Sequence, residues 1–116
     1  MEMKKLGLSS IVIPRTNVSM RIHIDSDCRV DLRAKRKSED EALNLVEKLR
    51  RAGYKPSMYV DGEDHVVLIT HSNIRDSPLK LIVCKKLSKW LEGEKNERRR
   101  ERIAKTMQNL KCFNNT

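Results

Sequence analysis

Two stretches in which apolar and polar residues alternate stand out along the chain, and a short polar break separates them. Residues 18–24 have an apolar side chain at every second position, and residues 30–34 repeat the alternation. A period of two is typical of a strand that buries one face and leaves the other in water. We therefore predict a β-hairpin over residues 18–35, with its turn at residues 26–28.

A helix is predicted directly after this hairpin, between a start signal at Ser38 and an end signal at Gly53. Ser38 and Glu41 have the spacing of a capping box, in which the serine oxygen accepts a hydrogen bond from the first helical turn. Glycine just beyond the last apolar position suits the left-handed conformation that ends many helices. The buried stripe is expected at Ala42, Leu45, Val46, Leu49 and Ala52.

A second hairpin and two further helices are predicted from the rest of the chain. Asp61-Gly62 is a strong turn signal between strand-like segments. The strand that follows, residues 66–70, is almost continuously apolar, which favours a central place in the sheet. An apolar stripe over residues 79–91 predicts the next helix, with Pro78 in its first turn. Residues 94–110 then predict a charged helix with a thin apolar stripe.

These elements predict a small two-layer α+β domain in the order β-β-α-β-β-α, with an antiparallel sheet, helices on one face and a charged C-terminal helix. A chain of 116 residues fits a single domain over residues 1–116. Its core is expected in about residues 11–92 and the charged helix in about 94–111. The short run Ile11-Val12-Ile13, closed by Pro14, fits either an edge strand or the beginning of the first hairpin.

The net charge of +9 is distributed unevenly along the chain. Residues 1–37 carry an excess of five positive charges, residues 38–92 are balanced, and residues 93–116 carry an excess of four. A localised basic excess is what a phosphate-binding protein requires. A merely soluble, positively charged surface is the alternative.

The candidate binding residues lie in two basic sets. The first follows the polar face of the predicted hairpin and the residues after it, and comprises Arg21, His23, Arg29, Arg33, Lys35, Arg36 and Lys37. On one face of a two-stranded ribbon such side chains stand about 5 Å apart and repel one another unless an anion bridges them. The alternative is a solvated face on which Asp31 pairs with Arg29 or Arg33 across the ladder.

The second basic set lies on the predicted terminal helix and comprises Arg98, Arg99 and Arg102. Arg98 and Arg102 share one face of a helix, and Arg99 lies beside Arg102. For this run, phosphate contact and a solvated helix with i,i+4 ion pairs are equal alternatives.

The cysteines, acids and apolar runs limit the chemistry that we expect. Cys28, Cys84 and Cys112 are odd in number and widely spaced, which predicts neither a disulfide framework nor a zinc site and favours a reducing, cytoplasmic location. No run approaches the roughly 18 apolar residues of a membrane span. The acids at 25–31 could gather Mg²⁺, but Asp25-Ser26-Asp27 is more typical of a hairpin turn.

The function that these observations favour is a non-enzymatic nucleic-acid-binding domain that contacts phosphates through the outer face of its sheet, without cofactor or metal. The sequence leaves DNA and RNA as alternatives. A second hypothesis is a small inhibitor or assembly protein that docks its basic face on an acidic protein surface. A metal-dependent nuclease is the third.

The predicted element order between Val18 and Leu110 resembles half of a LAGLIDADG homing endonuclease without its signature helix. In that family the antiparallel sheet forms a saddle against the DNA major groove, so the resemblance implies a DNA-binding half-domain whose hairpin face contacts DNA. The chain departs from the family before Val18, where Leu6-Gly7-Leu8 leads to Ile11-Val12-Ile13 and not to a catalytic acid. The resemblance therefore implies binding and not cleavage.

Overall fold

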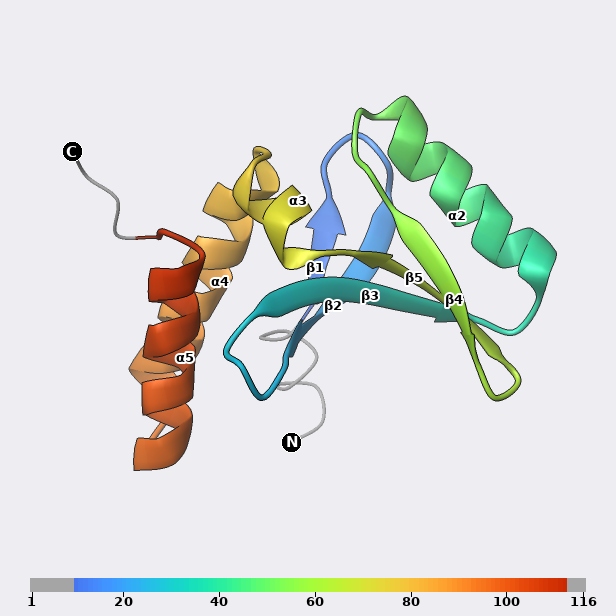
Figure 1. Ribbon diagram of the computed structural model, residues 1–116. Helices are drawn as coiled ribbons and strands as arrows, with labels where there is room; N and C mark the ends of the chain where they lie inside the picture. Colours follow the sequence, from blue (N-terminus) through green and yellow to red (C-terminus); the bar gives the residue numbers. More distant parts are fainter. Residues whose placement is uncertain (1–9, 113–116) are drawn as a thin grey trace.

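The protein is an antiparallel sheet with helices packed against it, as seen in a computed structural model that describes residues 10–112 (Figure 1). This is the small α+β domain that the sequence predicts. The predicted domain also includes residues 1–9 and 113–116, which lie outside the described part of the chain. The elements are β1 (Ser10–Ile13), β2 (Val18–Ile24), β3 (Val30–Arg36), α2 (Glu39–Arg51), β4 (Ser57–Asp61), β5 (Asp64–Ile69), α3 (His71–Arg75), α4 (Leu79–Gly93) and α5 (Glu97–Asn109).

The sheet has five strands in the order β1-β2-β3-β5-β4, and every neighbouring pair is antiparallel. Both predicted hairpins form, and the run Ile11-Val12-Ile13 belongs to an edge strand paired with β2. The apolar strand β5 lies inside the sheet, as its composition predicts, and both Val66 and Val67 are buried. The short helix α3 is an element that the sequence patterns did not predict.

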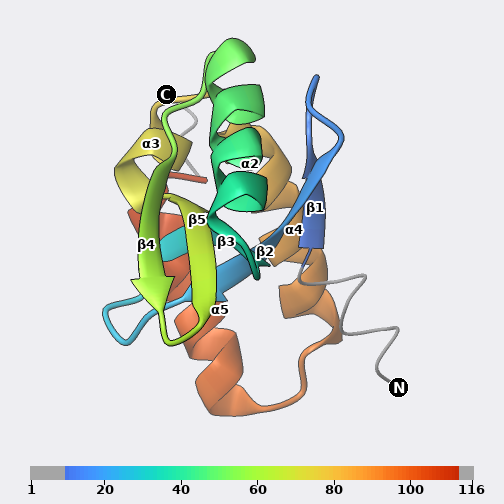
Figure 2. The same ribbon diagram turned by 90° about the vertical axis from the view of Figure 1, so that its right-hand side faces the viewer.

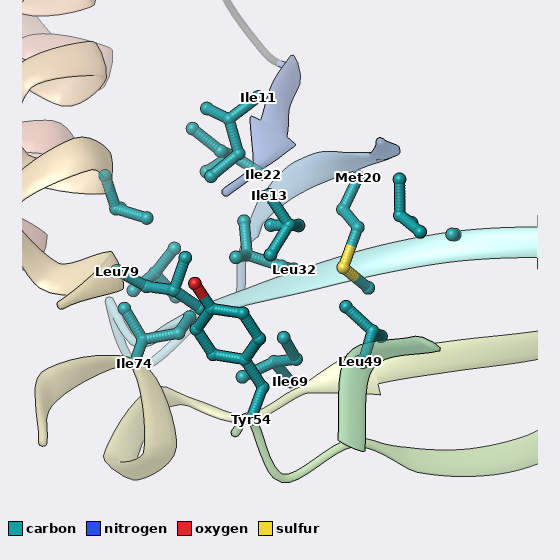
Figure 3. Packing of buried hydrophobic residues seen from close by; sticks show 14 of the residues in the cluster. Ile11, Ile13, Met20, Ile22, Leu32, Leu49, Tyr54, Ile69, Ile74 and Leu79 are labelled. Carbon is teal, nitrogen blue, oxygen red and sulfur yellow. The ribbon is translucent and has the colours of Figure 1, made fainter. Parts of the chain in front are cut away.

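The helices cover the apolar face of the sheet. Figure 2 shows α2 between the arm formed by β1 and β2 and the hairpin formed by β4 and β5. Inward side chains such as Met20 and Leu32 meet Leu49 of α2 and Leu79 of α4 in one continuous cluster (Figure 3). Trp90 belongs to the apolar stripe that the sequence predicts over residues 79–91, but it is only half-buried, at the margin of this cluster.

The predicted end signals of α2 are both confirmed. The Ser38 hydroxyl accepts a hydrogen bond from the Glu41 N–H at 3.1 Å, which satisfies one of the free donors of the first turn. Gly53 has a φ of +97°, and the Tyr54 N–H closes the helix end by donating to the Leu49 carbonyl at 3.0 Å. These local contacts fix where β3 ends and where β4 begins.

The hydrophobic core extends beyond residue 92, where the sequence analysis places its end, because helix α5 contributes buried residues to it. Its apolar stripe, Ile103, Met107 and Leu110, is buried in the same cluster as the strands. Figure 1 shows α5 beside the β2–β3 turn. Asn109 Nδ2 donates to the Cys28 carbonyl in that turn at 2.9 Å. The terminal helix is therefore joined to the tip of the basic hairpin.

The prediction of no disulfide is wrong, because Cys84 and Cys112 are bonded to each other. Helices α4 and α5 run in opposite directions (Figure 1), so the beginning of α4 lies next to the end of α5. This proximity depends on the helical hairpin, and a spacing of 28 residues along the chain does not reveal it. Cys28 is a free, buried thiol. Among residues 10–112, no helix combines the length and apolar character needed to cross a membrane.

Candidate nucleic-acid interface

The outer face of the sheet carries a row of side chains whose membership follows from the strand register. Arg21 is paired with Ser10 on one side and with Arg33 on the other, and Arg33 is paired in turn with Leu68. Directly paired residues project from the same face, with Cβ atoms about 4.5–5.5 Å apart. The side chains of Arg21 and Arg33 therefore leave the sheet opposite each other on the same face.

Strands β2 and β3 separate immediately beyond this arginine pair. Their pairing extends from Arg21 and Arg33 to Ile24 and Val30, while residues 18–20 pair only with β1 and residues 34–36 pair only with β5. Figure 1 shows the two strands diverging. The divergence leaves a hollow of about 530 Å³, lined by Ser19, Arg21, Ile22, His23, Arg33, Ala34, Lys35 and Arg36.

One carboxylate offsets part of the positive charge around this hollow. Asp31 accepts two hydrogen bonds from Arg33, at 2.9 Å from Nε and 3.3 Å from Nη2, and these bonds raise the pKa of Arg33 above its ordinary value. The same carboxylate lies 3.7 Å from His23 Nδ1. Asp31 thus pairs with Arg33 along the strand and not with Arg29. The ion pair between Asp31 and Arg33, which the alternative of a solvated face includes, is therefore present.

Arg21 and Lys35 have no carboxylate partner in the described part of the chain. Within residues 10–112, Arg21 and Lys35 form no ion pair, and both side chains are exposed at the hollow. The Arg36 guanidinium donates to the Lys35 carbonyl at 2.7 Å and borders the same hollow. Arg21 and Lys35 place positive charge on the outer side of the sheet, whereas Arg36, which directly follows Lys35 in β3, projects from the other face.

Two members of the predicted hairpin set lie away from the hollow. Arg29 is exposed at the turn, where its carbonyl accepts a hydrogen bond from the Asp25 N–H at 2.9 Å. Lys37 follows β3 and lies 3.2 Å from Asp64 on the second hairpin. The members of the predicted hairpin set that line the hollow are Arg21, His23, Arg33, Lys35 and Arg36.

Asp25 is a turn residue, as the sequence favours. Its Oδ1 accepts hydrogen bonds from the backbone N–H groups of Asp27 at 2.9 Å and Arg29 at 3.0 Å. The bond from Arg29 is the larger cause of a pKa below the ordinary value of 3.8, and the bond from Asp27 lowers it further. No cluster of His, Cys, Asp and Glu within residues 10–112 has a geometry that could hold a metal ion.

The three arginines predicted on the terminal helix have different environments. Arg102 Nη2 donates to the carbonyls of Ile24 at 3.3 Å and Asp25 at 2.8 Å, so it fastens α5 to the end of β2. Arg99 Nη1 lies 3.8 Å from a Glu94 carboxylate oxygen, and Arg98 is exposed. The set therefore contains one anchored and two solvent-facing guanidinium groups.

Arg100 has a structural role that sequence reasoning missed. Its Nη1 donates to the carbonyls of Leu91 at 2.7 Å and Glu94 at 3.0 Å, and so binds α5 to the C-terminal end of α4. No sequence signal separates this arginine from its neighbours, because the contact depends on how α5 folds back on α4.

The two basic sets meet at His23. A second hollow of about 280 Å³ lies between β2 and the helices α4 and α5, and it is lined by Ile22, His23, Ile24, Trp90, Arg99, Arg102 and Ile103. His23 lines both hollows. Sequence reasoning treated the hairpin and the terminal helix as independent charge clusters, whereas the packing of α5 against the β2–β3 turn makes them neighbours.

Tyr59 is a further residue of the outer face. Lys35 is paired with Val66 and Val66 with Tyr59, so the three side chains form one row. Val66 is fully buried, while Tyr59 remains 39% exposed. The outer face therefore offers an aromatic ring beside its cations.

Comparison of the chain with protein-family models, with curated proteins and with solved structures found no match in any of the three. The resemblance to half of a LAGLIDADG homing endonuclease rests on element order. The segment Leu6-Gly7-Leu8, where that family has its signature helix, lies outside the described residues. The candidate site is therefore described from the geometry of the structure only. It is the basic outer face of the sheet in a small α+β domain.

Proposed function

We propose that this protein binds nucleic acid without catalysing a reaction, and that the phosphates contact the outer face of the sheet at the hollow between β2 and β3. The observation that carries the proposal is the cross-strand pair of Arg21 and Arg33 at the mouth of this hollow, with Lys35 beside it. Asp31 is the one carboxylate that contacts this group of cations in the described chain.

The physical basis is electrostatic. Like charges directly opposite each other in a ladder destabilise the sheet, and a phosphate placed between them reverses the sign of that interaction. Neutralising phosphates also releases condensed counterions, which gives nucleic-acid binding its affinity and its dependence on salt. The bidentate pair of Asp31 and Arg33 holds one guanidinium in a fixed position, so less conformational entropy is lost when an anion binds.

One alternative is that the same face binds an acidic protein partner. Another is that the protein is a homing-endonuclease-like half-domain that binds DNA only. Cytoplasmic location stays a prediction, and the bond between Cys84 and Cys112 weighs against it, because disulfides are rare in reducing compartments.

The experiment is a fluorescence-anisotropy titration of the protein with labelled duplex DNA and with a structured RNA, from about 50 to 200 mM salt, the range over which phosphate contacts change affinity most visibly. We expect binding to at least one nucleic acid, with log affinity falling linearly as log salt rises. The matched control is polyglutamate of similar net charge. Tighter binding to polyglutamate than to either nucleic acid would contradict the proposal and support an acidic protein partner.

A further inference from the structure

We propose that the second hollow seats one unpaired base of a single-stranded nucleic acid against Trp90, while the adjoining phosphates contact Arg99 and His23. This inference rests on the proposed function and names the class of ligand that the site takes.

The floor of the second hollow is apolar and includes one aromatic ring. Ile22, Ile24 and Ile103 line it together with Trp90. Ile22 and Ile103 are buried, whereas Trp90 is half-buried and turns part of its indole toward the hollow. A half-exposed tryptophan in an apolar recess offers a stacking surface to any base, because every base has an aromatic face.

The rim of the hollow is cationic. The Arg99 side chain is 70% exposed, and its distance of 3.8 Å from Glu94 leaves it free to turn toward an anion. Arg102 is held in place by its hydrogen bonds to the carbonyls of Ile24 and Asp25. The apolar floor of the hollow suits the flat base of a nucleotide, and its cationic rim suits the phosphate.

The two hollows form one track because His23 lines both of them. A strand whose phosphates pass Lys35 and Arg21 reaches His23 and then the recess beside Trp90. His23 Nδ1 is enclosed by protein, 3.7 Å from an Asp31 carboxylate oxygen, and has no hydrogen-bond partner among the described residues. The His23 side chain as a whole is 43% exposed, so a ligand can contact the rest of the ring at the point where the two hollows join.

The size and shape of the recess select a single strand over a duplex. A volume of about 280 Å³ lies at the lower end of small-molecule sites, which span roughly 300–1,000 Å³, so it fits one base. Bases in a duplex are stacked and paired inside it, and only an unstacked base can present its face to an aromatic side chain.

The experiment uses Trp90 as its own reporter, since it is the only tryptophan of the chain. Labelled oligothymidylate and oligouridylate of about 12 nucleotides, within the span of single-strand sites, are titrated into the full chain. The matched control is an abasic deoxyribose phosphate oligomer of the same length. Anisotropy reports total binding, and Trp90 fluorescence reports stacking. A duplex is titrated in parallel.

We expect both base-carrying oligomers to quench Trp90 and to bind roughly tenfold or more tightly than the abasic oligomer, in line with the stacking contribution of one base. The duplex should bind without quenching. Trp90→Leu should abolish the difference between oligothymidylate and the abasic oligomer, whereas Trp90→Phe should retain most of it. If Trp90→Leu does not fold, the quenching of the wild-type protein by oligothymidylate but not by the abasic oligomer decides the matter.

Failure of this inference and failure of the proposed function give different results. Oligothymidylate that binds as well as the abasic oligomer and leaves Trp90 fluorescence unchanged overturns the base-stacking site, while sensitivity of that binding to Arg21→Ala leaves the phosphate-binding face intact. The absence of binding to any oligomer and to the duplex overturns both.

Discussion

At the scale of single residues, a few side chains hold the basic hairpin in its shape while their neighbours remain available. Asp31 orients Arg33, while Arg21 has no carboxylate partner among residues 10–112. Arg100 and Arg102 donate hydrogen bonds to backbone carbonyls, so two arginines of a dense charge run have a structural role. Net charge counted along the sequence cannot separate these roles, because both kinds of arginine contribute equally to it.

His71 is a structural residue of this kind, and its removal gives the first prediction. Its Nδ1 accepts a hydrogen bond from the buried Val30 N–H at 3.0 Å, and the geometry places the ring proton on Nε2, 3.2 Å from the Asn109 carbonyl. His71→Ala should lower the free energy of unfolding by about 1–3 kcal/mol, since it leaves a buried donor unsatisfied. Urea denaturation measures this loss. His65→Ala is the control, because His65 Nδ1 has no hydrogen-bond partner in residues 10–112, and an equal loss would contradict the assigned role.

Asp25 gives a prediction about pH. Its pKa in the folded protein lies below the ordinary value of 3.8, chiefly because the Arg29 N–H donates to its carboxylate. The unfolded chain therefore binds this proton more readily than the folded protein does. The stabilisation is fully present above the unfolded pKa and is lost as the pH falls through the folded pKa. We expect Asp25→Ala to be less stable than the wild type at pH 7 and the difference to shrink below about pH 4; a difference that grows on acidification would contradict the turn geometry.

At the scale of elements, short sequence signals correctly predicted those features that depend on contacts between residues close together in the chain. Ser38 and Gly53 mark the two ends of α2, because a helix cap depends on residues a few positions apart. Helix α3 and the bond between Cys84 and Cys112 could not be predicted in this way. The disulfide depends on how α4 packs with α5, and α3 begins at His71, whose ring contacts Val30 and Asn109; both features bring together residues that are far apart in the sequence. The same is true of the site: its hairpin cations were predictable, but their junction with α5 at His23 was not.

The packing of α2 against the sheet can be tested with one truncation. Leu49 is completely buried between α2 and the strands. Leu49→Ala should cost about 2–5 kcal/mol of unfolding free energy, from lost transfer energy and the cavity left behind. Leu43→Ala on the exposed side of the same helix should change stability by less than about 0.5 kcal/mol. Chemical denaturation of the two variants would contradict the packing if their stabilities were equal.

The disulfide makes a prediction about the helical hairpin of α4 and α5. Closing a loop across a sequence separation of 28 residues should contribute about 2–4 kcal/mol, mainly by restricting the unfolded chain. Cys84→Ser should therefore lower the free energy of unfolding by about that amount, and a reducing agent should lower the stability of the wild type but not of the variant. Two additional thiols in the native wild-type protein, titrated without reducing agent, would show that the bond does not form.

At the scale of the whole molecule, the helices on one face leave the other face of the sheet open. All helices of the described chain whose apolar residues enter the core do so from the side opposite Arg21 and Lys35. The divergence of β2 and β3 then turns a flat, self-repelling face into a hollow that can receive an anion. Helix α5 closes one end of the hairpin and adds Arg99 next to His23. The arrangement brings the basic hairpin and the basic helix α5 together, although the two lie far apart in the sequence.

The most direct measurement of the central claim compares two charge-matched double variants in nucleic-acid binding over a range of salt concentrations. Arg21→Ala with Lys35→Ala removes two cations from the hollow, and Lys48→Ala with Arg50→Ala removes two exposed cations from α2. We expect the first pair to weaken binding roughly tenfold or more and to reduce the slope of log affinity against log salt by about two. The α2 pair should leave both quantities close to those of the wild type. Equal losses in the two double variants would show that net charge, and not the open face of the sheet, is responsible for binding.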